Sequence, residues 1–84
     1  MRKMNTFYAY VATMNNGHEM IMMVFNDKGE QVPMIYPSKR EAETEETVVF
    51  VKHVANAHKM FIELREYIVT ENVTQYFPST GVLQ

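Results

Sequence analysis

Residues Tyr36–Ala57 read YPSKREAETEETVVFVKHVANA and carry the clearest local signal for structure in this chain. Ser38 is followed three residues later by Glu41, which is the spacing of a capping box. In that motif the serine oxygen accepts from the amide of Glu41, and the Glu41 carboxylate returns to the amide of Ser38. Pro37 keeps the residue before it extended, so the helix cannot easily begin earlier. The stretch therefore predicts a helix that begins at Ser38.

One stripe of this helix is expected to face a core, because its apolar residues recur at helical spacing. The stripe consists of Ala42, Glu46, Val49, Phe50, His53, Val54 and Ala57. The residues expected to fall off it, toward solvent or a second contact, are Val48, Val51 and Ala55. Neither glycine nor proline occurs between Ser38 and Phe77, so the helix end is unmarked and lies near Ala57 or near Leu64.

A hairpin is expected at the start of the chain. Asn5–Met14 and Glu19–Asn26 are rich in residue types that favour strands, and the Asn16-Gly17 pair between them is a strong hairpin signal. Glu19–Asn26 is apolar on both faces, which is typical of a central strand covered on both sides. The alternation leaves open which face of the hairpin meets the helix.

A third strand is expected at Gln31–Tyr36, after a turn that ends at Gly29. Pro33 cannot donate to a ladder, so this strand should lie at an edge or contain a break. Beyond the helix, Met60–Thr70 contains β-branched and aromatic residues that favour a further strand. The tail after it either holds a short strand at Val73–Phe77 or lies loosely.

The fold is therefore expected to be α+β: a three-stranded antiparallel meander, one helix and a C-terminal strand, in the order β-β-β-α-β. Residues 1–84 are expected to form a single domain. Disorder is an open alternative for residues 1–4, and a loose tail is one for residues 71–84. The expected core residues are Phe7, Ala9, Val11, Ile21, Met23, Phe25, Ile35, Ala42, Val49, Phe50, His53, Val54 and Ala57.

Composition narrows the classes of function. The chain has 84 residues, a net charge of −2 and no cysteine. This slightly negative net charge argues against a nucleic-acid binder, since such proteins usually present a basic face. No apolar run is long enough for a membrane span, and the basic residues at the start of the sequence are not followed by the apolar run of a signal peptide, so a cytoplasmic location is expected. The absence of cysteine fits a reducing compartment.

No catalytic motif or cofactor motif occurs, and we expect a protein that is not an enzyme and that holds no cofactor or metal. His18 sits beside a turn, and His53 lies in the predicted core stripe, where a partly buried structural role is the simpler interpretation. His53 and His58 are five residues apart, whereas zinc-binding histidine pairs on helices are four apart.

Two features indicate surfaces for a partner. The first is the acidic run at the helix start, where the macrodipole favours carboxylates; Glu43 and Glu45 are its candidate contacts. Glu46 lies in the core stripe and is expected at its rim or beside Arg65. The second is one face of the first hairpin, since a single helix can cover only one side of a sheet. Its candidate contacts are Tyr8, Tyr10, Met20 and Met22, of types enriched at interface cores.

The organisation of Phe25–Val51, with a glycine turn before a capped, glutamate-rich helix, resembles that of small accessory proteins encoded by bacteriophages, of the anti-CRISPR or another anti-defence type. The resemblance implies a protein that binds a host protein, for instance a defence nuclease complex, and inhibits or redirects it. We therefore expect a non-enzymatic protein-binding module that acts by occluding a partner's surface. The alternatives are a homo-oligomeric structural protein that buries its second sheet face, or a small nucleic-acid-binding protein.

Overall fold

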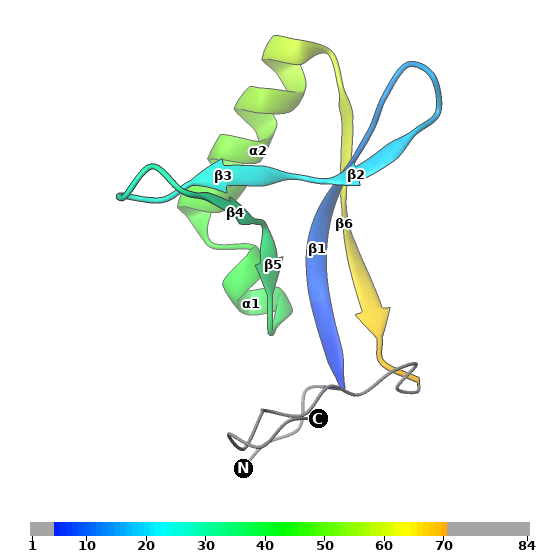
Figure 1. Ribbon diagram of the computed structural model, residues 1–84, viewed down its shortest axis with the longest axis vertical. Coiled ribbons are helices and arrows are strands. Elements are labelled where there is room, and N and C mark those ends of the chain that lie inside the picture. The colour runs from blue at the N-terminus through cyan, green and yellow to red at the C-terminus, as the bar shows by residue number, and fades with distance from the viewer. Residues whose placement is uncertain (1–4, 71–84) are drawn as a thin grey trace, which may run out of the picture.

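The computed structural model describes residues 5–70. Its elements are β1 (Thr6–Thr13), β2 (Glu19–Ile21), β3 (Met23–Phe25), β4 (Gln31–Pro33), β5 (Ile35–Tyr36), α1 (Lys39–Ala42), α2 (Glu45–His58) and β6 (Phe61–Ile68). A mixed α+β fold with antiparallel strands is confirmed (Figure 1). The order β-β-β-α-β is not, because the second and third predicted strands each divide in two. The expectations for residues 1–4 and 71–84, including a strand at Val73–Phe77, lie outside the described residues.

β1 lies at the centre of the main sheet, in place of the second predicted strand. Along one edge, β6 pairs antiparallel with the whole of β1, from Thr6 opposite Ile68 to Thr13 opposite Phe61. The other edge is shared by two short strands. β2 pairs with the C-terminal part of β1, and β5 pairs with Tyr8 and the residue after it. The chain between β2 and β5 therefore has to leave the sheet.

The chain between β2 and β5 leaves the sheet at a junction where three backbone segments are hydrogen-bonded to one another. The Tyr10 N–H donates to the Met34 carbonyl (3.3 Å), Met34 N–H to the Met22 carbonyl (2.8 Å), and Met22 N–H to the Tyr10 carbonyl (2.9 Å). These bonds satisfy backbone groups that would otherwise be unpaired where the strands divide. The break expected beside Pro33 is confirmed, because the ladder ends there and resumes in β5 after Met34.

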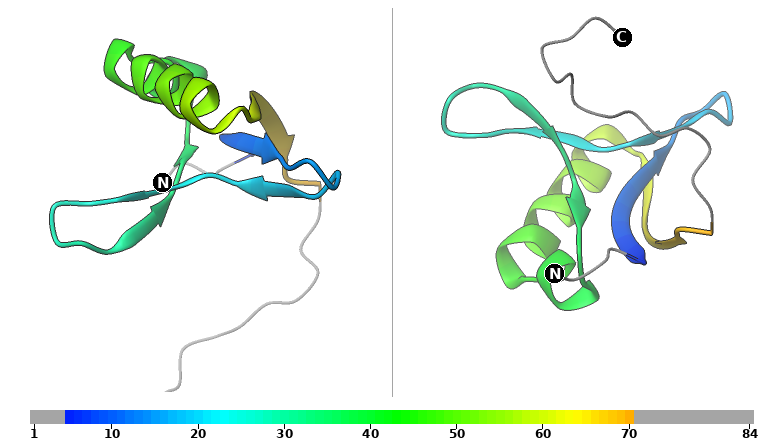
Figure 2. Two further views of the ribbon diagram at one scale, coloured as in Figure 1. Left: turned by 90° about the horizontal axis from the view of Figure 1, so that it is seen from above. Right: turned by 60° about the horizontal axis from the view of Figure 1, so that its bottom comes forward.

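Beyond the junction, β3 and β4 form a separate two-stranded hairpin, here called the arm, which projects from the body of the molecule (Figure 2). Its register places Met23 opposite Pro33, Val24 opposite Val32 and Phe25 opposite Gln31. Since side chains of directly opposed residues share a face, Val24 and Val32 lie on one side of the arm. Val24 packs against the core, so this side faces the body.

The predicted single helix is two helices. Ser38 caps α1, and its oxygen accepts from the Glu41 N–H at 3.2 Å, as the capping box predicts. The return contact differs, because the Ser38 hydroxyl rather than its amide donates to the Glu41 carboxylate, at 2.9 Å. Thr44 then caps α2 and accepts from the Thr47 N–H. The sequence signal for this second helix start, which the prediction missed, is a capping threonine followed by two glutamates.

α2 buries a different face from the predicted one, because the break before Thr44 resets the helical phase. Its buried and half-buried residues are Thr47, Val48, Val51, Val54 and Ala55. The prediction that Val48, Val51 and Ala55 lie off the core-facing stripe was therefore wrong. Most of the predicted stripe is exposed instead, with Val49 at 61% and Phe50 at 41%, and with Glu46, His53 and Ala57 also exposed. Its members Ala42 and Val54 are buried and half-buried, as predicted.

The end of α2 agrees with the shorter of the two expectations. The helix ends at His58, and Lys59 closes it in the left-handed conformation, with φ 54°. Glycine usually takes this position, which explains why the sequence shows no end signal. The strand expected after the helix is confirmed as β6.

The core lies between the helices and the sheet face that carries Tyr10. It consists of Tyr10, Ala12, Met22, Met34, Ala42 and Val51. The buried Tyr10 hydroxyl donates to the Ala42 carbonyl at 2.6 Å and so joins the centre of the sheet to α1. This contact fixes which face of the first hairpin meets the helices, a point that the alternation left open.

The predicted core was therefore partly wrong. Among its members, Ala9, Val11 and Ala42 are buried, and Phe7, Ile21 and Val54 are half-buried. The members that are exposed are Met23, Phe25, Ile35, Val49, Phe50, His53 and Ala57. Met23 and Phe25 are exposed because they belong to the arm, and the four α2 residues because of the phase change.

Candidate interaction surfaces

The hairpin face predicted to meet a partner is the face that the helices cover. Tyr10 is only 5% exposed and Met22 only 8%, so neither offers a free side chain to another protein. Tyr8 is half-buried, and its hydroxyl donates to the Glu66 carboxylate at 2.7 Å. That bond raises the pKa of the Tyr8 phenol, because ionisation would remove the donor and place two negative charges together. Among the four predicted contacts, Met20 is the exposed one, at 48%.

The predicted acidic contacts do lie on the surface. Glu43 ends α1 and Glu45 begins α2, and both side chains are exposed. Lys39 lies 3.9 Å from the Glu43 carboxylate, one helical turn away. Glu46 does not face Arg65, which pairs with two other carboxylates.

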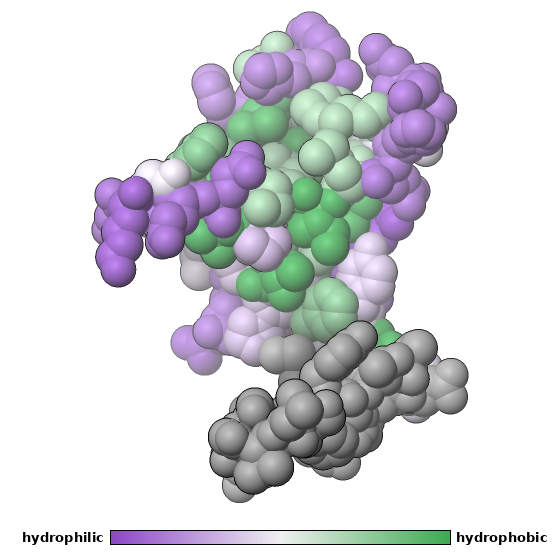
Figure 3. Space-filling view, in the orientation of Figure 1, coloured by the Kyte–Doolittle hydropathy of each residue, from purple (hydrophilic) through white to green (hydrophobic). Residues whose placement is uncertain are grey.

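The opposite face of the sheet carries an ion cluster. Arg65 of β6 donates to both carboxylate oxygens of Glu19 on β2, at 2.9 and 2.6 Å, and to Glu63 at 2.6 Å. To reach Glu19 the Arg65 side chain crosses β1, where Val11 is only 2% exposed. The arginine stem can therefore shield apolar surface while its charge is neutralised at the rim. This face carries apolar side chains at the centre of Figure 3.

The arm presents the first uncovered apolar surface. The side that faces away from the core carries Met23, Phe25, Gln31 and Pro33, all exposed, and is here called the arm face. Phe25 is 71% exposed, the largest fraction among the exposed large apolar side chains of residues 5–70. An aromatic ring this bare is a suitable anchor for a protein partner, since aromatic residues dominate interface energetics.

The tip of the arm is held in place by one side chain. The Asn26 amide oxygen accepts from the Lys28 N–H and the Glu30 N–H, both at 2.9 Å, and its amide nitrogen donates to the Glu30 carboxylate. Gly29 has φ 80°, a conformation that side chains rarely adopt. The backbone of the arm is therefore held by hydrogen bonds at both ends, at the junction and at this turn.

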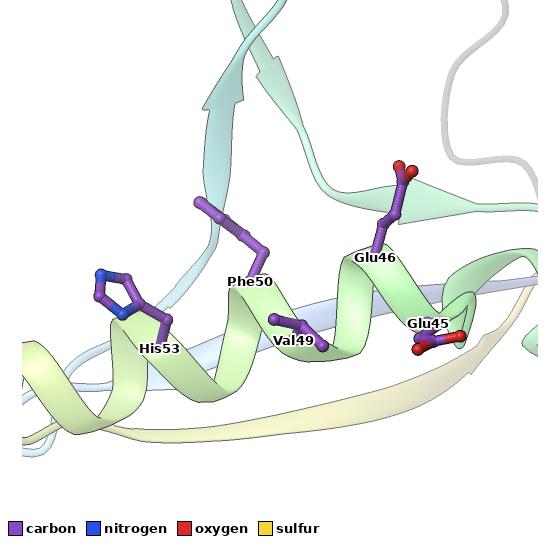
Figure 4. A pocket seen from close by; sticks show the side chains of 5 residues that line it. All are labelled: Glu45, Glu46, Val49, Phe50 and His53. Carbon is purple, nitrogen blue, oxygen red and sulfur yellow. The ribbon is translucent and has the colours of Figure 1, made fainter.

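The second uncovered surface lies on α2 and is here called the α2 outer face: Glu46, Val49, Phe50 and His53. These residues, with Glu45, line a shallow, open hollow. Figure 4 shows Glu46, Phe50 and His53 leaving the same side of the helix, with Val49 beside them. α2 is thus apolar on two faces, one against the core and one uncovered. A helix of that kind is typically buried on both faces.

The histidines do not form a metal site within residues 5–70, where no group of three suitable ligands comes together. His18 belongs to the hairpin turn, where its backbone N–H donates to the side-chain oxygen of Asn16 at 3.0 Å. His53 lies on the α2 outer face, so the expectation of a partly buried histidine was wrong. His58 lines a small hollow beside Thr13 at the end of the sheet.

These surfaces could be found in the sequence only in part. The stripe of Glu46, Val49, Phe50 and His53 is visible in the helical pattern, but so is the competing stripe around Val51. The arm leaves no distinct signal, because Glu19–Asn26 reads as one continuous apolar strand.

Comparisons of the chain with models of protein families, with curated proteins and with solved structures found no match. Among residues 5–70, neither helix is long and apolar enough to cross a membrane.

Proposed function

We propose that this chain is a non-enzymatic protein-binding module that inhibits or redirects a partner protein by occluding its surface, and that the arm face makes the central contact. The observation that carries the proposal is Phe25, 71% exposed on an arm that is hydrogen-bonded at base and tip. As the resemblance to small phage accessory proteins implies, the proposed partner is a host protein, such as a component of a defence nuclease complex.

Two physical arguments support the arm face. A pre-ordered contact loses little conformational entropy on binding, and the arm's turn and junction already hold its backbone. Phe25 and Met23 are also of the types enriched at interface cores. Burying the exposed part of a phenylalanine ring contributes roughly 25 cal/mol for each Å² of apolar surface removed from water.

Glu43 and Glu45 are proposed as a second, acidic contribution to binding, because both carboxylates are exposed at the helix junction. Such charges steer association more than they strengthen it. The two contributions can be separated by salt, since exposed charges are screened beyond about 8 Å at about 0.15 M ionic strength. The apolar contact should persist at high salt, while the acidic contribution should fade.

The experiment is affinity capture from cells of the native host with a matched pair of variants, Phe25→Ser and Phe61→Ser. Phe61 is 64% exposed on β6, so both changes remove a similarly bare ring. The proposal expects Phe25→Ser to lose the partner and Phe61→Ser to retain it. Equal capture by both variants, at unchanged thermal stability, would rule out the arm face as the contact.

A further inference from the structure

We propose that the α2 outer face is a self-association surface, on which the α2 of a second copy of this chain packs antiparallel. The proposal rests on the order of the four residues along the helix. They run acid, apolar, apolar, imidazole: Glu46, Val49, Phe50 and His53. When a second helix runs in the opposite direction, its order is imidazole, apolar, apolar, acid, so each acid faces an imidazole and each apolar residue faces an apolar one.

The pairing follows from a two-fold axis between Val49 and Phe50. Residues whose numbers add to 99 then face each other across the axis, as expected when the same patch is used by both copies. Val49 of one copy meets Phe50 of the other, and Glu46 of each meets His53 of the other. The His53 ring can donate an N–H to the Glu46 carboxylate, twice in the pair.

The opposite orientation is unfavourable. In a parallel pair, Glu46 would face Glu46 of the second copy, and the acidic start of α2, with Glu45, would meet its own copy. Like charges in contact are destabilising, so the charge order favours the antiparallel pair. Antiparallel helices also set the positive end of one macrodipole beside the negative end of the other.

The exposed surface fits a contact of this kind. Val49 is 61% exposed and Phe50 41%, beside the hollow that Glu46 and His53 also line. One helix face is smaller than the roughly 800 Å² that each partner contributes to a standard interface, so the pair should be weak. The arm face lies on a different element, and a pair would present two arms. The inference therefore stands apart from the proposed function.

The test is the mass of the full chain by sedimentation equilibrium, at concentrations up to about 1 mM. We expect concentration-dependent dimerisation, with Glu46→Lys and His53→Glu each weakening it about tenfold. Combining them, Glu46→Lys with His53→Glu, should restore the wild-type dimer, because each lysine then faces a glutamate of the other copy. Asp27→Lys makes the same charge change as Glu46→Lys on the exposed turn of the arm, and should dimerise like the wild type.

A strict monomer at about 1 mM would overturn the proposal. So would a dimer that survives Phe50→Ser, or a combined variant that stays as weak as its parents. Thermal melts of every variant identify any loss that comes from unfolding. The two proposals can fail separately. If a monomeric Phe50→Ser variant captures the host partner, the arm proposal stands. If a Phe25→Ser variant dimerises normally but captures no partner, the α2 proposal stands.

Discussion

Arg65 of β6 and Glu19 of β2 are joined across the central strand by two hydrogen bonds, Nη1 to Oε1 at 2.9 Å and Nη2 to Oε2 at 2.6 Å. This bidentate pair links β2 and β6, which lie on opposite sides of β1. Since Glu63 shares the same guanidinium, one arginine pairs with two carboxylates. The sheet face opposite the helices therefore carries an ion cluster that spans β1, the strand of Val11.

Replacing Arg65 should separate its two roles. Arg65→Met retains a long apolar stem over Val11 but leaves Glu19 and Glu63 without a counter-charge, whereas Arg65→Ala removes both stem and charge. Thermal denaturation should give the order wild type, Arg65→Met, Arg65→Ala, from most to least stable. Equal melting temperatures for the two variants would mean that the stem covers nothing.

The same pair makes stability depend on pH in the acid range. The Arg65 guanidinium lowers the pKa of the Glu19 carboxyl, so the unfolded chain takes up this proton at a higher pH than the folded one. The stabilisation is present above the ordinary glutamate pKa of about 4.3 and is lost as pH falls toward the lowered value. The melting-temperature gap between wild type and Glu19→Gln should therefore narrow from about pH 6 to about pH 3. A constant gap would contradict this linkage.

Val49 and Val51 provide a matched test of the helix faces. Val51 is 8% exposed in the core and Val49 is 61% exposed. Val51→Ala should cost about 1–3 kcal/mol in free energy of unfolding, since it removes two buried methyl groups and leaves a cavity. Val49→Ala should change it by less than about 0.5 kcal/mol. Urea denaturation at low protein concentration measures both free energies. A larger loss for Val49→Ala would mean that the core-facing side of α2 is the one that the sequence pattern predicted.

Tyr10 should be sensitive to loss of its hydroxyl. Tyr10→Phe leaves the Ala42 carbonyl without its buried donor and should cost about 1–2 kcal/mol. Tyr8→Phe is the control, because the Tyr8 hydroxyl bonds to Glu66 in contact with solvent, and its loss should cost less. Both can be measured by urea denaturation. Equal costs would show that the Tyr10 hydroxyl does not fix the sheet to α1.

The sequence predicts the elements better than their partners. The Ser38 cap, the hairpin turn at Gly17 and the strand after the helix follow from local chemistry, which a short window contains. The division of two strands at Met22 and Met34 does not, because it depends on hydrogen bonds to Tyr10, distant in sequence. A methionine suits either outcome, since it fills irregular spaces.

The candidate surfaces, too, could be predicted from the sequence only in part. The expectation that one side of the sheet remains for other contacts rests on counting helices, and both helices do lie on one side of the core. Which residues are uncovered depends on helical phase, and the cap at Thr44 shifts it. The exposure of Glu43 and Glu45 was predictable from the sequence, because acidic side chains at a helix terminus are exposed in either phase. Phe25 was not, because a bare aromatic on an arm has the same sequence pattern as a core strand.

Hydrogen–deuterium exchange on the chain bound to its captured partner locates the contact. If the arm face binds the partner, residues 23–33 of the arm gain protection and residues 61–68 of β6 remain unchanged. Protection confined to residues 61–68, with the arm exchanging as it does in the free chain, would contradict a contact at the arm face.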